Sequence, residues 1–312
     1  MLFRSAVERV NERAMRWSTR HTSVWVELPG QSDGLGQICL WGRDRVFPDD
    51  SKTPVYLNKP YALNHTLAKY KPRQYVVYRA SAPIVIDGSI NEKAWQDAKW
   101  TDAFEDAQSP YCPQPWKMTR AKILYDDEHL YVAAQLQEEN VWGHITQRDS
   151  IVYYDNDFEV FVDPPADAVN YFEYEMTCLN TMFDMWHEND NHRGALADGR
   201  YDAPGLRSAV QVQGTLNYHY DIDEGWTAEV KIPFRDMKMK NPAMSLPVKR
   251  GDMWRMNFSR VEYLHVYSQL FPYLLPYSPC EDWVWNTTHG GDLHIPEMWA
   301  KAVFPDLEAG SV

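Results

Sequence analysis

The chain has 312 residues, 14% of them aromatic, and a net charge of -13. This length is sufficient for one large domain with an extension or for two modest domains. No run of about 18 apolar residues occurs, so the sequence predicts no membrane-spanning helix. The acidic balance argues against binding to nucleic acid, whose phosphates attract basic proteins.

Basic residues are concentrated at the beginning of the chain. Residues 1–79 hold 13 Lys and Arg against 7 Asp and Glu, a net charge of +6, which leaves -19 for residues 80–312. Within residues 1–17 the apolar side chains share one face of a potential helix and the arginines lie opposite. We therefore expect an amphipathic helix, which is either a docking helix or a segment resembling a mitochondrial transit peptide. The rest of residues 1–79 lacks periodic apolar pattern and is expected to wrap the main domain or bind a protein partner.

The cysteines and the amino terminus bear on localisation. Four scattered cysteines form no metal-binding or disulfide-dense pattern, which favours reduced thiols. The beginning of the chain lacks the apolar core of about 7–15 residues that a secretory signal needs. We expect a protein that is not classically secreted but intracellular, with the mitochondrion as the organellar candidate.

Residues 80–312 contain short strands separated by turn signals. A helical turn is expected over 91–98, and the alternation of apolar and polar residues predicts the strands. The expected strands are 83–86, 119–125, 130–136, 148–163, 171–183, 209–214, 217–221, 226–232 and 254–260, with an irregular segment over 187–205. Strands 119–125 and 130–136 flank a tight turn and predict a hairpin. The fold class is therefore all-β, an antiparallel β-sandwich with an irregular, partly helical N-terminal extension.

The strand expected over 148–163 has one aromatic and acidic face. At a two-residue period Tyr153, Asp155, Asp157 and Glu159 point the same way. Neighbouring carboxylates repel one another, so water, a cation, Arg and Lys, or a hydroxyl-rich ligand must compensate them. A solvated face balanced by Arg148, Lys231 and Arg255 is the alternative that needs no function.

Several local patterns follow one another along residues 80–312. They are Ile86 to Glu92 with Trp95, Leu124 to Val132, the acidic strand through Pro164, Tyr171 to Glu175, Gly225 to Phe234, Trp254 to Arg260 and His294 to Trp299. In this order they resemble family 9 carbohydrate-binding modules, a DOMON-related group of β-sandwiches, over about residues 83–304. The resemblance implies a β-sandwich, no catalysis, bound calcium, and glucose- or xylose-type sugars held between aromatic rings.

The resemblance also suggests which residues hold a mono- or oligosaccharide. Tyr153 or Trp142 is the candidate for the first stacking ring, and Trp283 or Trp285 for the second. Asp157, Glu159 and Asn180 are the candidates for hydrogen bonds to the hydroxyls. No arginine can be placed on the strand that follows the acidic one, where sugar-binding members of the family carry one.

Some of the same residues are also candidates for binding a metal ion or haem. Asp155 and Asp157 are candidate calcium ligands, although the glycine turn of a calcium loop is missing. Two neighbouring carboxylates could also cleave a glycosidic bond, but nothing in the resemblance supports cleavage. Met176, Met182, Met185 and His187 lie close together in the sequence and are candidate haem ligands. Haem is the weaker alternative, because methionines commonly fill a hydrophobic core and His187 begins an expected loop. His187 and His192 lack the spacing of helical zinc ligands.

Two functions follow from these observations. The first is a non-catalytic carbohydrate-binding protein that recognises its sugar by aromatic stacking. The alternative is an accessory subunit that has lost its ligand and is docked through residues 1–79 into a larger, mitochondrial assembly.

Overall fold

The computed structural model describes residues 71–108, 112, 114–188, 196–263, 280–289 and 291–311, together with four short strands closer to the N-terminus. Those four are β1 (Met15–Ser18), β2 (Val24–Val26), β3 (Gly36–Ile38) and β4 (Arg45–Pro48), and β1 pairs with β4 and β2 with β3. The prediction of an amphipathic helix over 1–17 is wrong for its last residues, because strand β1 begins at Met15. The remainder of that helix lies outside the described residues.

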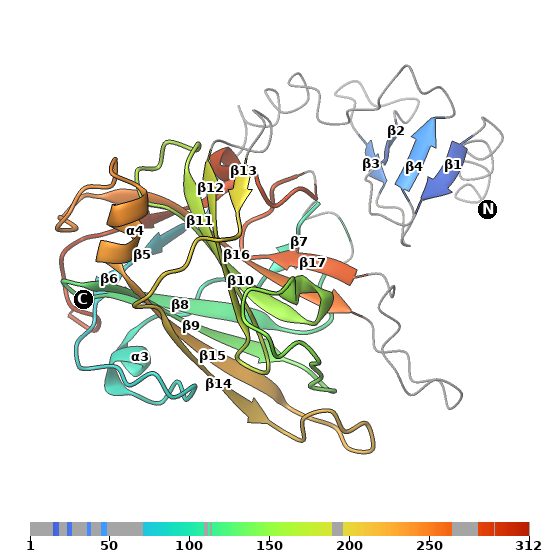
Figure 1. The fold of residues 1–312 in the computed structure, drawn as a ribbon, viewed down its shortest axis with the longest axis horizontal. Helices are drawn as coiled ribbons and strands as arrows, with labels where there is room; N and C mark the ends of the chain where they lie inside the picture. The colour runs from blue at the N-terminus through green and yellow to red at the C-terminus, as the bar shows by residue number, and fades with distance from the viewer. Residues whose placement is uncertain are drawn as a thin grey trace.

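The rest of the described chain forms two sheets that pack face to face (Figure 1). The larger has the strand order β13-β12-β11-β10-β16-β17-β7, with β18 pairing β16 and β5. Its strands are β5 (Gln74–Val76), β7 (Glu105–Asp106), β10 (Asp157–Asp163), β11 (Tyr171–Thr177), β12 (Met182–Glu188), β13 (Leu196–Asp198), β16 (Met253–Tyr263), β17 (Cys280–Val284) and β18 (Ala300–Val303).

The smaller sheet has the order β14-β15-β9-β8-β6. Its strands are β6 (Tyr78–Arg79), β8 (Thr119–Tyr125), β9 (His129–Gln137), β14 (Arg207–Gln213) and β15 (Gly225–Pro233). All pairings are antiparallel apart from β5 with β18 and β6 with β8. Short helices α3 (Lys93–Asp97), α4 (Phe234–Lys240), η1 (Val152–Tyr154) and η3 (Pro296–Met298) complete the described elements. The all-β sandwich predicted from the sequence is confirmed, and strands β5 and β6 place residues 74–79 within it.

Alternate side chains of both sheets form one hydrophobic core. Phe158, Val160 and Val162 of β10 meet Val132 of β9 and Val230 of β15 there, and all five are buried. Because side chains alternate across a strand, Asp157, Glu159 and Phe161 point to the opposite, outer face of the larger sheet. We call this side the outer face below.

The outer face of the smaller sheet is covered by the segment that contains α3. Glu229 of β15 accepts hydrogen bonds from Trp95 Nε1 at 2.7 Å and from the Asp87 and Gly88 amides at 2.9 and 2.8 Å. Gly88 has φ +88° and its Cα faces Val210, where a Cβ would lie 2.5 Å from the backbone carbonyl carbon, so only glycine fits. The Asp-Gly turn and Trp95 therefore serve to attach this segment to the sheet.

Other sequence predictions have mixed outcomes. The 119–136 hairpin, the helical turn and the strands at 209–214, 226–232 and 254–260 are confirmed. Residues 83–86 and 217–221 form no strand, and residues 148–156 form loop and η1 instead of the first half of β10. The strand expected over 171–183 turns at 178–181, and β12 occupies part of the segment expected to be irregular.

Two further findings concern cysteine and membranes. Cys178 and Cys280 are free thiols, whereas Cys112 is disulfide-bonded. The expectation that the thiols are all reduced is therefore wrong. Within the described ranges, the longest helices are far too short to cross a bilayer, and none qualifies as a membrane span.

Candidate functional site

Three carboxylates converge on the outer face because of the strand register. Glu159 of β10 is the direct partner of Glu175 on β11 and of Ser259 on β16. Asp157 lies two residues from Glu159 on the same strand and therefore on the same face. Directly paired side chains have Cβ atoms about 4.5–5.5 Å apart. The result is an acidic cluster, defined here as Asp157, Glu159 and Glu175, in which one oxygen of each residue lies within 4.8 Å of the others.

The acidic cluster is buried and its hydrogen bonding is incomplete. Asp157 Oδ1 accepts one bond, from the Val261 amide at 3.1 Å. Asp157 Oδ2, Glu159 Oε2, Glu175 Oε2 and the Ser259 hydroxyl are all buried without a hydrogen-bond partner. Such groups are exceptional in folded proteins, because each one loses its water without replacement.

In the part of the chain that the structure describes, no Lys or Arg pairs with these three carboxylates. The basic residues proposed to balance them act elsewhere: Arg148 pairs with Asp202 at 2.9 Å, and Arg255 donates to the Glu297 carbonyl at 2.8 Å. Lys231 lies on the smaller sheet, over the Tyr131 ring. The solvated, balanced acidic face is therefore not what the fold contains.

The electrostatic result is a large shift in proton affinity. Burial raises the pKa of Asp157, Glu159 and Glu175 well above the usual carboxyl range, and the repulsion among these residues and Glu173 raises it further. The cluster therefore has a strong tendency to take up positive charge.

A second group lies beside the cluster on β11 and β12. Glu173 Oε2 and His187 Nε2 are 2.5 Å apart, and His294 Nδ1 is 2.9 Å from the Tyr171 hydroxyl. Although burial opposes ionisation of Glu173, the neighbouring His294 and His187 hold its pKa below the usual value. This group resembles a metal site in composition, but the histidines already compensate its carboxylate.

Helix η1 lies at the rim of the outer face. Val152 is buried against Phe183 and Met185 of β12, the direct partners of Glu175 and Glu173. Tyr153 follows with 39% of its surface exposed. Helix η1 therefore carries a partly exposed aromatic residue next to the strand that holds Asp157 and Glu159.

Asp155 does not join Asp157 in a metal site. Its Oδ2 accepts hydrogen bonds from the His144 and Ile145 amides at 2.6 and 2.8 Å, and its Oδ1 lies 3.2 Å from His144 Nδ1. Asp155 and Asp157, which were expected to bind calcium together, therefore have different surroundings. Asp157 lies in the acidic cluster, while Asp155 holds the loop before η1 in place.

Trp283 and Trp285 lie on the other side of the larger sheet from the acidic cluster. Each has 1% of its surface exposed, and both belong to the core between the sheets. Trp283 pairs with Arg260, whose guanidinium lies 5.2 Å from the indole ring. The two tryptophans share a face as their spacing indicated, but the rings are enclosed and offer no platform to a ligand.

Asn180 also lies apart from the cluster. It occupies the β11–β12 turn at φ 59°, is exposed, and donates from Nδ2 to the Ser208 carbonyl of β14 at 3.2 Å. An open depression of about 270 Å³ surrounds it, lined by Thr146, Arg148, Leu179, Asn180, Thr181, Met182 and Ser208. Of the six proposed sugar-binding residues, Asp157 and Glu159 share one face of β10, and Tyr153 lies on η1, four residues before Asp157 in the chain.

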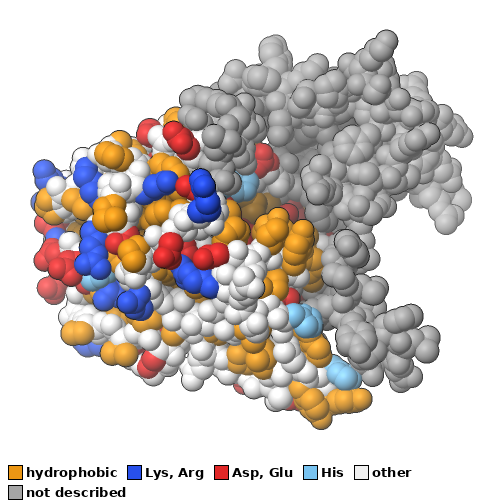
Figure 2. Space-filling view, viewed as in Figure 1, with side chains coloured by type: hydrophobic (Ala, Val, Ile, Leu, Met, Phe, Trp, Pro, Cys, Tyr) orange, Lys and Arg blue, Asp and Glu red, His pale blue; other side chains and the backbone are white. Residues whose placement is uncertain are grey.

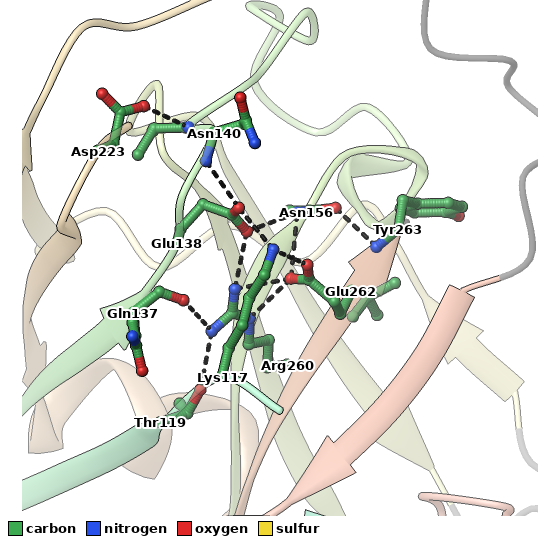
Figure 3. A network of polar contacts seen from close by, with 12 residues as sticks. Lys117, Thr119, Gln137, Glu138, Asn140, Asn156, Asp223, Arg260, Glu262 and Tyr263 are labelled. Atoms are coloured by element: carbon green, nitrogen blue, oxygen red, sulfur yellow. Dashed lines mark hydrogen bonds and ion pairs between the residues drawn. The ribbon is translucent and has the colours of Figure 1, made fainter. Parts of the chain in front are cut away.

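A different charged cluster lies on the core-facing side of β16, together with residues that flank β8, β9 and β10 (Figure 3). Lys117 Nζ lies 2.6 Å from Glu138 and 2.5 Å from Glu262, and an Arg260 amino group lies 2.9 and 2.6 Å from the same two carboxylates. Asn156 donates to both glutamates and accepts from the Tyr263 amide. We call these residues the inner network. Two cations and two carboxylates make it balanced.

Sequence reasoning missed Glu175, Ser259 and the whole inner network. Glu175 gave a signal, because its strand alternates with the glutamates outward. Ser259 gave none, since only the register of β16 against β10 brings it beside Glu159. The inner network combines residues far apart in the chain, with no common spacing.

Comparison with known proteins gives a family and a fold. Residues 86–252, more than half of the chain, match the family described as carbohydrate family 9 binding domain-like. A putative carbohydrate-binding protein from Bacteroides uniformis superposes with a TM-score of 0.55 at 13% identity, covering 75% of this chain and 100% of that one. A family 9 carbohydrate-binding module from Caldicellulosiruptor kristjanssonii in complex with glucose gives 0.50 at 14% identity, covering 75% and 96%. No curated protein sequence matches.

At these identities the solved structures establish the fold alone. The family match includes strands β10 and β11, which carry Glu159 and Glu175, and the Asp87-Gly88 turn that binds Glu229. This chain belongs to the carbohydrate family 9 binding domain-like family.

Proposed function

We propose that the protein binds a glucose- or xylose-type sugar without cleaving it, at the rim of the outer face. The observation that carries this proposal is the position of Tyr153, an exposed ring on η1 that immediately precedes the strand of Asp157 and Glu159. A pyranose presents a flat face of C–H groups to such a ring and hydroxyls around its edge. The family assignment and the glucose bound to the Caldicellulosiruptor module support the ligand class.

In this proposal the ring of Tyr153 stacks on the sugar while Asp157 and Glu159 accept its hydroxyl protons. Both acids have a buried oxygen without a partner, so a hydroxyl donor would satisfy what the protein leaves open. Trp283 and Trp285 are given no part in it, because their rings are enclosed in the core.

Isothermal titration calorimetry with glucose, xylose and cello-oligosaccharides tests the proposal. Heat of binding is expected with at least one of them, and no heat with any sugar at millimolar concentration would contradict it. Tyr153→Ala is expected to weaken binding by roughly 2- to 12-fold, the equivalent of an aromatic contact of about 0.5–1.5 kcal/mol.

The matched control is Tyr220→Ala. Tyr220 is a more exposed tyrosine in the loop that joins β14 and β15, where exposed hydrophobic side chains are visible at the lower edge of Figure 2. This variant should bind sugar as the unmodified protein does. An equal loss in both variants would place the sugar elsewhere.

A further inference from the structure

Two histidines and a glutamate meet on the outer face, beside the acidic cluster but made of other residues. His187 of β12 is the direct partner of Tyr171 on β11, and Glu173 lies two residues further along β11 on the same face. His294 comes from the segment between β17 and η3, and its ring packs on those of Phe161 and His187. One donor atom each from Glu173, His187 and His294 lies within 4.8 Å of the others. We call these three residues the histidine–glutamate group.

The donor atoms of this group differ in kind from those of the acidic cluster. Two are imidazole nitrogens, which suit zinc and related transition metals, whereas carboxylate oxygens alone suit calcium and magnesium. Two histidines and one carboxylate form a familiar donor set for zinc, with water in the fourth position of the tetrahedron. The group therefore matches a zinc-type ion and not a hard cation.

A proton now occupies the place that such an ion would take. Glu173 Oε2 and His187 Nε2 are 2.5 Å apart, the separation of a short hydrogen bond between charged partners. His187 Nδ1 is buried and has no partner among the described residues, so Nε2 is the nitrogen that faces the group. This bond compensates Glu173 with one shared proton. A metal ion replaces the protons of its ligands when it binds, and it can bond to His294 at the same time.

The spacing of the group is suitable after a small adjustment. Zinc bonds of about 2.0–2.2 Å place neighbouring ligands of a tetrahedral site about 3.3–3.6 Å apart. Glu173 and His187 would therefore separate by about 1 Å to admit the ion, a movement within the reach of a side-chain rotation. The upper limit of 4.8 Å on the other separations requires a shift of similar size.

Tyr171 supports both histidine rings. Its own ring stacks on that of His187, with centroids 4.4 Å apart and planes 11° from parallel. Its hydroxyl lies 2.9 Å from His294 Nδ1. Histidines that bind metal commonly hold their second nitrogen on such a partner, which fixes the ring and its tautomer. The Tyr171 hydroxyl thus leaves His294 Nε2 for the ion.

The surroundings combine burial with a route of entry. Phe161, Tyr171 and Trp299 form a hydrophobic cluster beside the group. Such apolar walls exclude water and strengthen the attraction between a cation and a carboxylate. Glu173 and His187 are buried, whereas His294 is only half-buried. An ion would therefore reach the group from the side of His294.

We infer that Glu173, His187 and His294 bind a divalent transition-metal ion of the zinc type, with Tyr171 holding the two imidazoles in position. The site uses none of the carboxylates that the proposed function gives to the sugar, and it does not rest on that function. A bound ion joins β11 and β12 to the segment that leads to η3.

The test uses the full chain without sugar, stripped with EDTA and then dialysed against zinc at pH 7.5. Metal analysis after removal of free zinc should give one ion per chain. An excess of calcium should not displace it, because imidazole nitrogens are poor ligands for a hard cation. Cobalt in place of zinc should give the strong visible absorption of a four-coordinate site.

Variants assign the site, with zinc affinity measured by competition with a coloured chelator. Tyr171→Phe keeps the stacked ring but loses the hydroxyl, and it should weaken zinc binding by about 10- to 100-fold. His294→Gln removes a direct ligand from a half-buried position and should cost more. Glu173→Gln provides the same test if that variant fails to fold. His219→Gln, at a half-buried histidine in the β14–β15 loop, is the control and should keep the affinity.

Failure of the unmodified protein to retain zinc, or displacement of the zinc by calcium, would overturn the inference. Unchanged affinity in both His294→Gln and Glu173→Gln would overturn it as well, and so would a loss in His219→Gln of the same size as in His294→Gln. Because no sugar is present, each result leaves the proposed carbohydrate binding to be judged by its own calorimetry.

Discussion

The two faces of the larger sheet carry buried charge in opposite ways. On the inner face, Arg260 and Lys117 meet Glu138 and Glu262, and amide groups satisfy the remaining oxygens. On the outer face, Glu159 meets Glu175 and the Ser259 hydroxyl, and no Lys or Arg among the described residues pairs with it. Both clusters are enclosed, so burial alone does not distinguish them.

The difference shows what each cluster can do. A balanced, fully bonded network fixes one arrangement of side chains and has no unsatisfied group to offer a ligand. A cluster with unpaired carboxylates, by contrast, is stabilised by any ligand that supplies positive charge or hydrogen-bond donors. The inner network is therefore a structural feature between the sheets, and the acidic cluster is the place to look for binding.

The largest expected effect comes from unbalancing the inner network. Arg260→Met would leave Glu138 and Glu262 with Lys117 as their only cation. Removing one partner of a buried ion pair costs about 3–5 kcal/mol. Denaturant unfolding should show a loss of this size, and Arg207→Met, at an exposed site on β14, should change stability by less than about 0.5 kcal/mol. A small loss for Arg260→Met would mean that the inner network is not a major source of stability.

A second substitution tests whether the core face of the larger sheet contributes to stability alone or also to sugar binding. Trp285→Phe should lower the free energy of unfolding by about 1–3 kcal/mol, because it leaves a gap among Tyr75, Phe258 and the rest of the core. Sugar affinity, measured by calorimetry, should not change. A loss of sugar binding in a variant of unaltered stability would restore Trp285 to the binding site.

Asp163 is intermediate between the two clusters, because only part of its hydrogen bonding is satisfied, and the pH dependence of stability tests its role. Its Oδ2 accepts a hydrogen bond from the Ala168 amide at 2.8 Å, and its Oδ1 is buried without a hydrogen-bond partner. Burial raises its pKa from 3.8 to about 7, against the lowering effect of the Ala168 amide. The folded state therefore holds this proton more tightly than the unfolded chain does. Its stabilising contribution is complete below pH 3.8 and is lost as the pH rises through about 7.

Asp163→Asn should remove that part of the pH dependence. Thermal midpoints measured from pH 4 to pH 8 should fall less steeply in the variant, with a gain over the parent chain that grows between about pH 4 and pH 7 and is constant above that. Parallel curves for the two proteins would show that Asp163 titrates normally. The effect should be smaller than that of Arg260→Met, since one group with a backbone donor is involved.

The sequence predicted the parts of the fold that repeat a simple period. The hairpin of β8 and β9 and the core side of β10 were predictable because apolar residues alternate there over a full strand. Residues 148–156 imitate the same alternation but form η1, because Val152 is buried on Phe183 and Met185 and Asp155 binds the amides of the 144–145 loop. Neither contact has a local signal.

The candidate site was predictable only within single strands. The acids of β10 and the outward glutamates of β11 followed from alternation, but their pairing and the approach of Ser259 depend on register. Trp283 and Trp285 show the same limit: their shared face was correct, whereas which face it was depended on the packing of β17 against β16. Residues 1–70, apart from four short strands, lie outside the described structure, so docking through that extension stays a prediction.

The contrast between the two faces is tested most directly by one pair of matched substitutions. Glu138→Gln and Glu159→Gln each replace a buried glutamate by its uncharged counterpart of nearly the same size. Thermal unfolding of both variants in EDTA at pH 7.5 should give opposite signs: a lower midpoint for Glu138→Gln, which loses its charge pairing with Lys117 and Arg260, and a higher midpoint for Glu159→Gln, which is relieved of Asp157 and Glu175. Midpoints lowered to a similar extent in both would contradict the account.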